Sequence, residues 1–237
     1  IFSWINGSEY KKSKNFYKKY NPHNSTIDCE VANSDDNEIN LAIESASNSF
    51  LNWSNINPVK RGKILYEYVN LLKINKKQLA EIVARETGKI LSHASGEVDA
   101  AISVGEFFAG EGSRLYSNSL TSGMDNKYSQ MVREPLGICG LIVPANTPIA
   151  NICWKIFPAL ICGNTVVLKS SEDAPQIALE VIKLSKEAGI PNGVINTING
   201  LAQAGKTLVN DKRISLISFT GSSKVGKAIA QSAGARL

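Results

Sequence analysis

The segment GSSKVGKA, from Gly221 to Ala228, comes close to the phosphate-binding loop pattern G-x-x-x-x-G-K-[ST]. Lys227 is in place, but Ala228 stands where a serine or threonine hydroxyl must hold magnesium. Only nine residues follow, too few for the strand whose aspartate completes the metal site, so we do not expect a nucleotide hydrolase. The segment still predicts an anion site for a pyrophosphate, because Gly221 allows close backbone approach and Ser222 lies at a helix N-terminus. Taken alone, a well-capped helix is the simpler interpretation.

A second polar pair, Lys169 and Glu172, lies just beyond the apolar run TVVLK. At this position a carboxylate can accept hydrogen bonds from the ribose hydroxyls of an adenosine, and the lysine ammonium can donate to them. Without further context, the same two residues also fit an ordinary surface turn.

Both polar sites lie in a segment, between Gly137 and Ala233, where apolar strand-like runs alternate with amphipathic helices. The four runs are Ile138–Val143, Thr165–Lys169, Val194–Ile198 and Leu216–Thr220. Strands alternating with helices of this length indicate right-handed crossovers and a mostly parallel sheet, hence an α/β fold. Ligands of such sheets bind at the carboxyl ends of the strands, where these polar residues stand.

The amino-terminal half predicts two short strands, four helices and a hairpin. The predicted strands are Ser3–Gly7 and Asn15–Pro22. The first helix begins at Asn37, the second begins at Pro58 with Asn57 as its cap, the third ends at Gly88, and the fourth spans Ser92 to Tyr116. The polar segment from Ser117 to Arg133, with Gly123 at its turn, predicts a β-hairpin that leaves the globule.

Composition excludes several classes of protein. The net charge is +5 with 21 acidic residues. We interpret the five lysines between Lys11 and Lys19 as guards of a solvated edge strand, and we expect no nucleic-acid partner. No apolar run approaches the roughly 20 residues of a membrane-spanning helix, so we expect no membrane partner either.

Cysteine and histidine usage indicates a reduced, metal-free protein. The cysteines form no CxxC pair and are expected to be reduced core residues, which predicts a cytoplasmic setting: Cys29, Cys139, Cys153 and Cys162. His23 and His93 are too few for a histidine-based zinc site or a Ser-His-Asp triad, and we expect both at the surface.

Several blocks together resemble the aldehyde dehydrogenase superfamily, in the same order and at similar spacing over essentially the whole chain. They are WING (4–7), ETGK (86–89), REPLGICGLIVPANTP (133–148), WKIFPALICGNTVVLKSSE (154–172), EAGIPNGVINTING (187–200) and ISFTGSSKVG (217–226). The resemblance implies a modified Rossmann-type parallel sheet with helices on both faces, lacking the usual G-x-G-x-x-G. It also implies the cofactor NAD, with NADP possible, and a small-molecule aldehyde as substrate.

The resemblance assigns roles to individual residues. Asn146 matches the asparagine whose amide stabilises the oxyanion formed when a thiolate attacks the aldehyde, and Lys155 matches a lysine that influences proton transfer and cofactor placement. The implied cofactor contacts are Ile142, Val143, Pro144, Ala145, Asn146, Lys169, Ser171, Glu172, Gly221, Ser222 and Val225. Two departures stand out: Ala145 replaces the tryptophan common in the family, and Ser170 replaces a proline, a change we expect a loop to tolerate.

The resemblance further implies three parts of the chain. Residues 1–116 are expected to pack on the cofactor domain, residues 117–136 to form a β-hairpin oligomerisation arm of a homodimer or homotetramer, and residues 137–237 to form the Rossmann-type dinucleotide-binding domain. None of the four cysteines matches the family's nucleophile, so we expect an inactive amino-terminal fragment of an enzyme that oxidises aldehydes through a cysteine thiohemiacetal and thioester. The alternative is a non-catalytic dinucleotide-binding or scaffold protein.

Overall fold

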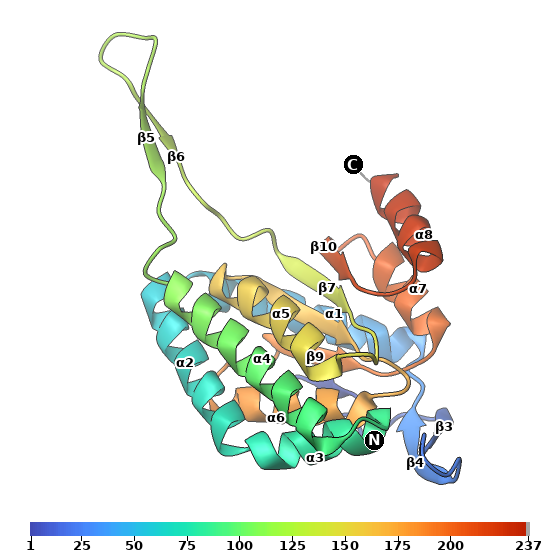
Figure 1. Cartoon of the computed structure of the whole chain (residues 1–237). Coiled ribbons are helices and arrows are strands. Elements are labelled where there is room, and N and C mark those ends of the chain that lie inside the picture. Colours follow the sequence, from blue (N-terminus) through green and yellow to red (C-terminus); the bar gives the residue numbers. More distant parts are fainter. Residues whose placement is uncertain (236–237) are drawn as a thin grey trace.

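A six-stranded sheet runs through the computed structural model, which describes residues 1–235 (Figure 1). In spatial order its strands are β10 (Ile214–Phe219), β7 (Ile138–Ile142), β8 (Thr165–Lys169), β9 (Ile195–Ile198), β1 (Trp4–Ile5) and β2 (Ser8–Glu9). Strands β10, β7, β8 and β9 are parallel, whereas β1 and β2 extend the sheet antiparallel. The predicted α/β fold with a parallel sheet is confirmed, and β2 is an addition that the sequence pattern did not show.

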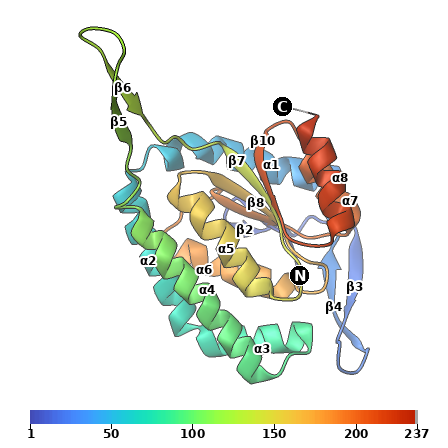
Figure 2. The same cartoon turned by 45° about the horizontal axis from the view of Figure 1, so that its top comes forward.

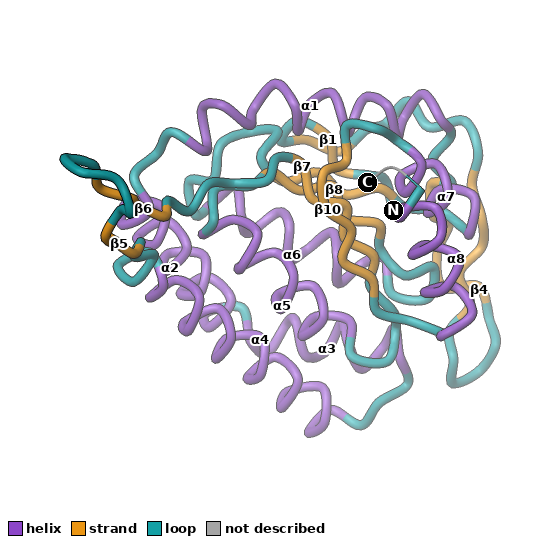
Figure 3. Tube along the Cα trace, turned by 90° about the horizontal axis from the view of Figure 1, so that it is seen from above, coloured by secondary structure: helices purple, strands orange, loops and turns teal. Residues whose placement is uncertain are grey.

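Helices cover both faces of this sheet (Figure 3). Helices α1 (Asp36–Ser54) and α7 (Ala202–Asn210) lie on one face, and α5 (Pro148–Ile161) and α6 (Pro175–Glu187) lie on the other. Helices α2 (Pro58–Ile74), α3 (Lys76–Thr87) and α4 (Leu91–Glu111) form an outer layer over α5 and α6.

Two apolar clusters fill the spaces between these layers, and β8 contributes to both. Val166 and Leu168 belong to the larger cluster on the α5–α6 side, whereas Val167 belongs to the cluster beneath α1 and α7. Successive residues of a strand point to opposite faces, and both faces of β8 are covered. This explains why β8 is a continuous apolar run rather than an alternating one.

The predicted starts and stops of the first helices are confirmed. The Asn57 side chain accepts a hydrogen bond from the Val59 N–H at the start of α2, and Gly88 ends α3 with φ 74°. Helix α4, however, ends at Glu111 and not at Tyr116. The next N–H groups, from Gly112 onward, bond to the carbonyl three residues earlier, so the last turn tightens and the helix stops.

The second predicted strand lies in a different sheet from the first. Strand β3 (Phe16–Tyr20) pairs antiparallel with β4 (Ile27–Ala32), which the pattern did not predict. The prediction of a fully solvated lysine edge is wrong for Lys19. Its side chain is buried and its Nζ lies 3.0 Å from Oδ2 of Asp28.

The predicted hairpin is present and extends away from the body of the molecule (Figures 1 and 2). Strand β5 (Asn118–Thr121) pairs antiparallel with β6 (Tyr128–Met131), and every residue of both strands is exposed. Gly123 lies in the turn between the strands, as predicted, and the left-handed residue of that turn is Asn126, with φ 61°. None of the helices in residues 1–235 is long and apolar enough to cross a membrane.

Candidate functional site

A cleft of about 690 Å³ opens at the carboxyl ends of β7, β8 and β10, beside helices α7 and α8 (Ser223–Gly234). Its lining includes every predicted cofactor contact except Asn146. These residues are Ile142, Val143, Pro144, Ala145, Lys169, Ser171, Glu172, Gly221, Ser222 and Val225. The fold therefore brings together side chains from three separate loops at the predicted edge of the sheet.

The end of β8 presents a charged pair to this cleft. Lys169 is buried and donates from Nζ to Oε2 of Glu172 at 3.0 Å. Burial by itself would raise the pKa of Glu172, but the Lys169 ammonium outweighs it and holds that pKa below its ordinary value. The Glu172 side chain stays 49% exposed, so an ionised carboxylate stands on the wall of the cleft.

The backbone around this pair is fixed by neighbouring elements. The Tyr17 hydroxyl of β3 donates to the carbonyl of Glu172 at 3.3 Å. Ser170, which we expected in a tolerant loop, is fully buried. Its N–H donates to the Ile198 carbonyl at 3.1 Å and its hydroxyl to Oδ1 of Asn199 at 2.8 Å. A proline here would lose the N–H bond, so this serine extends the pairing of β8 with β9.

The start of α8 forms the opposite wall. Ser222 is the N-cap, and its hydroxyl accepts from the Val225 N–H at 3.4 Å. A Cβ at Gly221 would lie 2.5 Å from a ring carbon of Phe219. The Phe219 ring therefore leaves no room for a side chain at position 221. No residue of α8 is buried in residues 1–235.

Sequence reasoning missed the contribution of α7. The cleft is lined by Ala202, Gly205, Lys206 and Val209 of α7, together with Ile229 of α8. A Cβ at Gly205 would meet nothing within 4 Å, so this glycine leaves the wall open. A glycine inside a helical pattern was the signal that could have identified this wall.

The two predicted catalytic residues do not lie in this cleft lining. Asn146 is exposed in the loop between β7 and α5, and its side chain makes no hydrogen bond within residues 1–235. Lys155 lies in α5 and donates from Nζ to the Ser218 hydroxyl of β10 at 2.8 Å. Burial lowers the pKa of Lys155.

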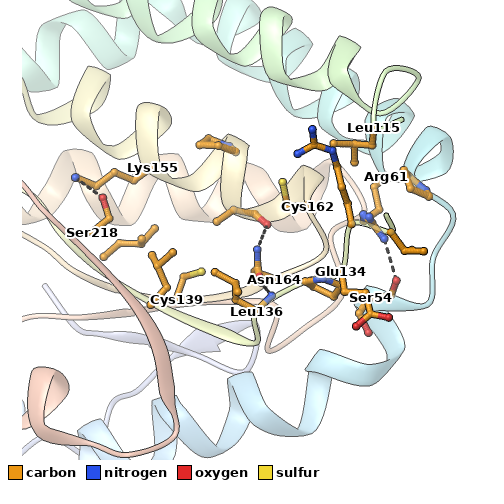
Figure 4. Close-up of a pocket in the computed structure, with 18 of the residues that line it drawn as sticks. Ser54, Arg61, Leu115, Glu134, Leu136, Cys139, Lys155, Cys162, Asn164 and Ser218 are labelled. Carbon is orange, nitrogen blue, oxygen red and sulfur yellow. Dashed lines mark hydrogen bonds between the residues drawn. The ribbon is translucent and has the colours of Figure 1, made fainter. Parts of the chain in front are cut away.

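Lys155 lines a second cavity of about 650 Å³ between α5 and the base of the hairpin (Figure 4). Lys155 and Ser218 stand at one end and Arg61 at the other, with Asn164 between them. Arg61 donates to the carbonyls of Ser54 and Ile161, at 3.0 and 3.1 Å. Asn164 accepts from two backbone N–H groups, so both residues mainly hold the backbone together.

The cysteines are free thiols, and none is set up as a nucleophile. Burial raises the pKa of Cys139 to about 12 and raises that of Cys153 further. The prediction of a core position is wrong for Cys162, which is exposed at the end of α5, and only partly right for Cys29. Partial desolvation still raises the pKa of Cys162, against the opposing charges of Arg61 and Arg133. A reactive thiol needs the opposite shift.

Metal chemistry has no visible basis in the described residues. Within residues 1–235, no group of three or more His, Cys, Asp or Glu side chains could hold a metal ion. His23 and His93 are both exposed, as expected for surface residues.

The parallel sheet with helices on both faces, the cleft at its carboxyl edge and the capped α8 define a doubly wound α/β protein, the class whose ligands bind at the carboxyl ends of the strands. Residues 9–237 match the family model described as "Aldehyde dehydrogenase family". The chain belongs to the aldehyde dehydrogenase family.

Similar proteins support this assignment in sequence and in structure. Betaine aldehyde dehydrogenase of Bacillus subtilis is 38% identical over 76% of this chain and 37% of its own length. A betaine aldehyde dehydrogenase from Staphylococcus aureus, solved in complex with NAD⁺, superposes with a TM-score of 0.96 at 30% identity, over 100% of this chain and 49% of its own. An NADP-dependent enzyme of E. coli superposes with a TM-score of 0.96 at 31% identity, over 99% of this chain and 49% of its own. The chain thus spans about half the length of these relatives or less.

Proposed function

We propose that this chain forms the cofactor-binding part of an NAD(P)-dependent aldehyde dehydrogenase, which oxidises an aldehyde to a carboxylic acid. The observation that carries the proposal is that the Lys169–Glu172 pair and the N-terminus of α8 line the same cleft. Of the relatives about twice as long, one was solved in complex with NAD⁺ and another is an NADP-dependent enzyme. The full-length enzyme would be a protein of the relatives' length that contains this chain.

The residues of the cleft fit the parts of a dinucleotide. The slot between α7 and α8, walled by Val209, Val225 and Ile229 and left open by Gly205, is apolar and suits an adenine ring. The Glu172 carboxylate can accept from ribose hydroxyls. Ser222 lies at the N-terminus of α8, where backbone dipoles favour a pyrophosphate.

The bound cofactor would supply the hydride acceptor for the oxidation. From this chain, Asn146 would donate its amide N–H to the oxygen that becomes negative when a thiolate adds to the aldehyde. Lys155 would act only indirectly, since its ammonium is engaged with Ser218. The thiolate would come from a part of the full-length enzyme other than the residues described, because no thiol among these has a lowered pKa.

Glu172 predicts a preference for NAD⁺ over NADP⁺. We expect the 237-residue chain to bind NAD⁺ at least roughly tenfold more tightly, because the carboxylate repels a 2′-phosphate. Glu172→Gln should lower the ratio of the NADP⁺ dissociation constant to that of NAD⁺, whereas Glu44→Gln, on the exposed side of α1, should leave this ratio unchanged. Titration calorimetry with both cofactors measures the ratio. A preference for NADP⁺ that persists in Glu172→Gln would remove the argument.

We expect the 237-residue chain to produce no NADH from aldehydes, even when it binds NAD⁺, because none of its four thiols is activated. Each thiol has a pKa raised by burial, so the thiolate needed for attack is scarce at neutral pH. The assay is absorbance at the NADH band with a panel of short aldehydes. Turnover that disappears in Cys139→Ser, Cys153→Ser or Cys162→Ser would overturn the assignment. A full-length enzyme that binds NAD⁺ but is equally inactive would favour the non-catalytic alternative.

The hairpin β5–β6 is proposed to be an oligomerisation arm that pairs with another subunit in a homodimer or homotetramer. A two-stranded ribbon is marginal alone, and this one is not joined to the central sheet. It exposes Leu120, Tyr128 and Met131.

We expect light scattering to give at least twice the monomer mass for the full-length enzyme at micromolar concentration. The double variant Leu120→Asp/Tyr128→Asp should reduce that mass to the monomer's, because charges would be placed in an apolar contact. Leu51→Asp, at an exposed leucine of α1, is the matched control. A monomeric wild-type enzyme would contradict the proposal.

A further inference from the structure

Helix α5 begins directly after the loop that carries Asn146, and it has no capping side chain of its own. Its N-cap residue, Thr147, makes no side-chain capping bond, and its first residue is Pro148, which has no N–H. The first backbone donors of the helix are therefore those of Ile149 and Ala150. Both residues are buried, so these donors need partners within the protein.

A carboxylate from the outer helical layer supplies the partner. Oε1 of Glu97, in α4, accepts from the N–H of Ile149 at 3.0 Å and from that of Ala150 at 3.4 Å. The other oxygen, Oε2, forms an ion pair with Nζ of Lys89. The Glu97 side chain is only 4% exposed, and these three donors satisfy a charge that would otherwise be costly to bury. A carboxylate at this end is also favoured by the helix dipole.

The same arrangement recurs one helix away, which shows that it is a feature of the fold. Helix α6 also begins with a proline and lacks a cap of its own. Glu86 of α3 accepts there from Gln176 N–H through Oε1 and from Ile177 N–H through Oε2, both at 2.8 Å. The two carboxylates bind their amides differently. Glu97 accepts from both amides through one oxygen, whereas Glu86 uses one oxygen for each amide.

We propose that Glu97, held by Lys89, is a positioning residue that fixes the Asn146 loop relative to the reacting carbonyl. Two residues separate Asn146 from the first amide that Glu97 binds. From within α5, Asn151 anchors the same loop through Nδ2, which donates to the Thr147 carbonyl at 2.9 Å and to its hydroxyl at 2.6 Å. The inference rests on the proposed function, in which Asn146 is the oxyanion donor, since a misplacement of about 1 Å at such a group can cost roughly 10²-fold in rate.

The test is a double-mutant cycle in the full-length enzyme. Glu97→Ala is expected to lower kcat by roughly 10- to 100-fold, with the KM for NAD⁺ changed less than about twofold, because Lys169 and Glu172 lie on another loop. Glu97→Gln should restore most of the rate, since its one carbonyl oxygen can still accept from both amides. Glu106→Ala, at an exposed glutamate of α4, is the control and should change neither constant.

Coupling to Asn146 separates positioning from a general structural role. Asn146→Ala/Glu97→Ala should be no more than about twofold slower than Asn146→Ala alone, because the cap has nothing left to position. Losses that multiply would overturn the inference. If Asn146→Ala alone kept near-normal activity, the proposed function would fail first, independently of Glu97.

Amide hydrogen exchange in the 237-residue chain gives a readout that needs no activity. The amides of Ile149 and Ala150 should exchange faster in Glu97→Ala and at the wild-type rate in Glu86→Gln, which disturbs only α6. Lys89→Met is the second variant, for the case that Glu97→Ala does not fold. It keeps the bonds from Oε1 but removes the ion pair that holds the carboxylate, so we expect Ile149 and Ala150 to exchange moderately faster than in the wild type. Wild-type exchange in Glu97→Ala, or in Lys89→Met where Glu97→Ala does not fold, would contradict the proposal.

Discussion

Replacing Asn146 by alanine is expected to lower kcat of the full-length enzyme by roughly 10²–10³, the usual loss for one oxyanion donor. The side chain is exposed in the loop that follows β7, and its amide has no hydrogen-bond partner within residues 1–235. It is therefore free to donate to a substrate oxygen. Steady-state kinetics with saturating NAD⁺ measures the effect.

The affinity for NAD⁺ should stay nearly unchanged in this variant, because Asn146 does not line the cofactor cleft. Asn48→Ala, at an exposed position on α1, serves as the control and should leave kcat unaltered. Wild-type activity in Asn146→Ala would mean that this asparagine only shapes the loop.

Replacing Phe157 by alanine is expected to destabilise the chain by about 3–5 kcal/mol, the range for a buried phenylalanine. Phe157 lies in α5 with 0% exposure, and its ring stacks on Tyr68 of α2 with centroids 5.2 Å apart. Gly105 of α4 leaves no spare room either, since a Cβ there would lie 3.0 Å from the Phe157 ring. The cavity left by the substitution is thus enclosed by three helices.

Urea unfolding of the 237-residue chain measures this loss as a shift of the midpoint at constant m-value. The control is Phe107→Ala on α4, where the side chain is 58% exposed and a loss below about 1 kcal/mol is expected. A loss of stability below about 1 kcal/mol in Phe157→Ala as well would show that the helical layers are not packed as described.

Local pattern was sufficient for the parallel strands and for the charged and capping residues of the cleft, Lys169, Glu172 and Ser222, whereas the other predicted lining residues followed from the family resemblance. The strand that leads into Lys169 is a continuous apolar run, as a strand covered on both faces requires, and its alternation with helices indicated a parallel sheet. The carboxyl ends of parallel strands meet at one edge, which placed Glu172 near Ser222 although 50 residues separate them. The caps at Asn57 and Gly88 were equally local, since each depends on one residue's own backbone or side chain.

Contacts between distant elements were decided by the tertiary structure alone. The burial of Lys19, the hydrogen bond from Lys155 to Ser218 and the capping of α5 by Glu97 each join residues from separate elements. Periodicity reports which face of an element is apolar, but it does not report which neighbour that face meets. A polar side chain inside the fold takes whatever partner packing brings within hydrogen-bond distance. For that reason the residues of the cleft could be predicted from sequence, whereas the carboxylates that hold its loops could not.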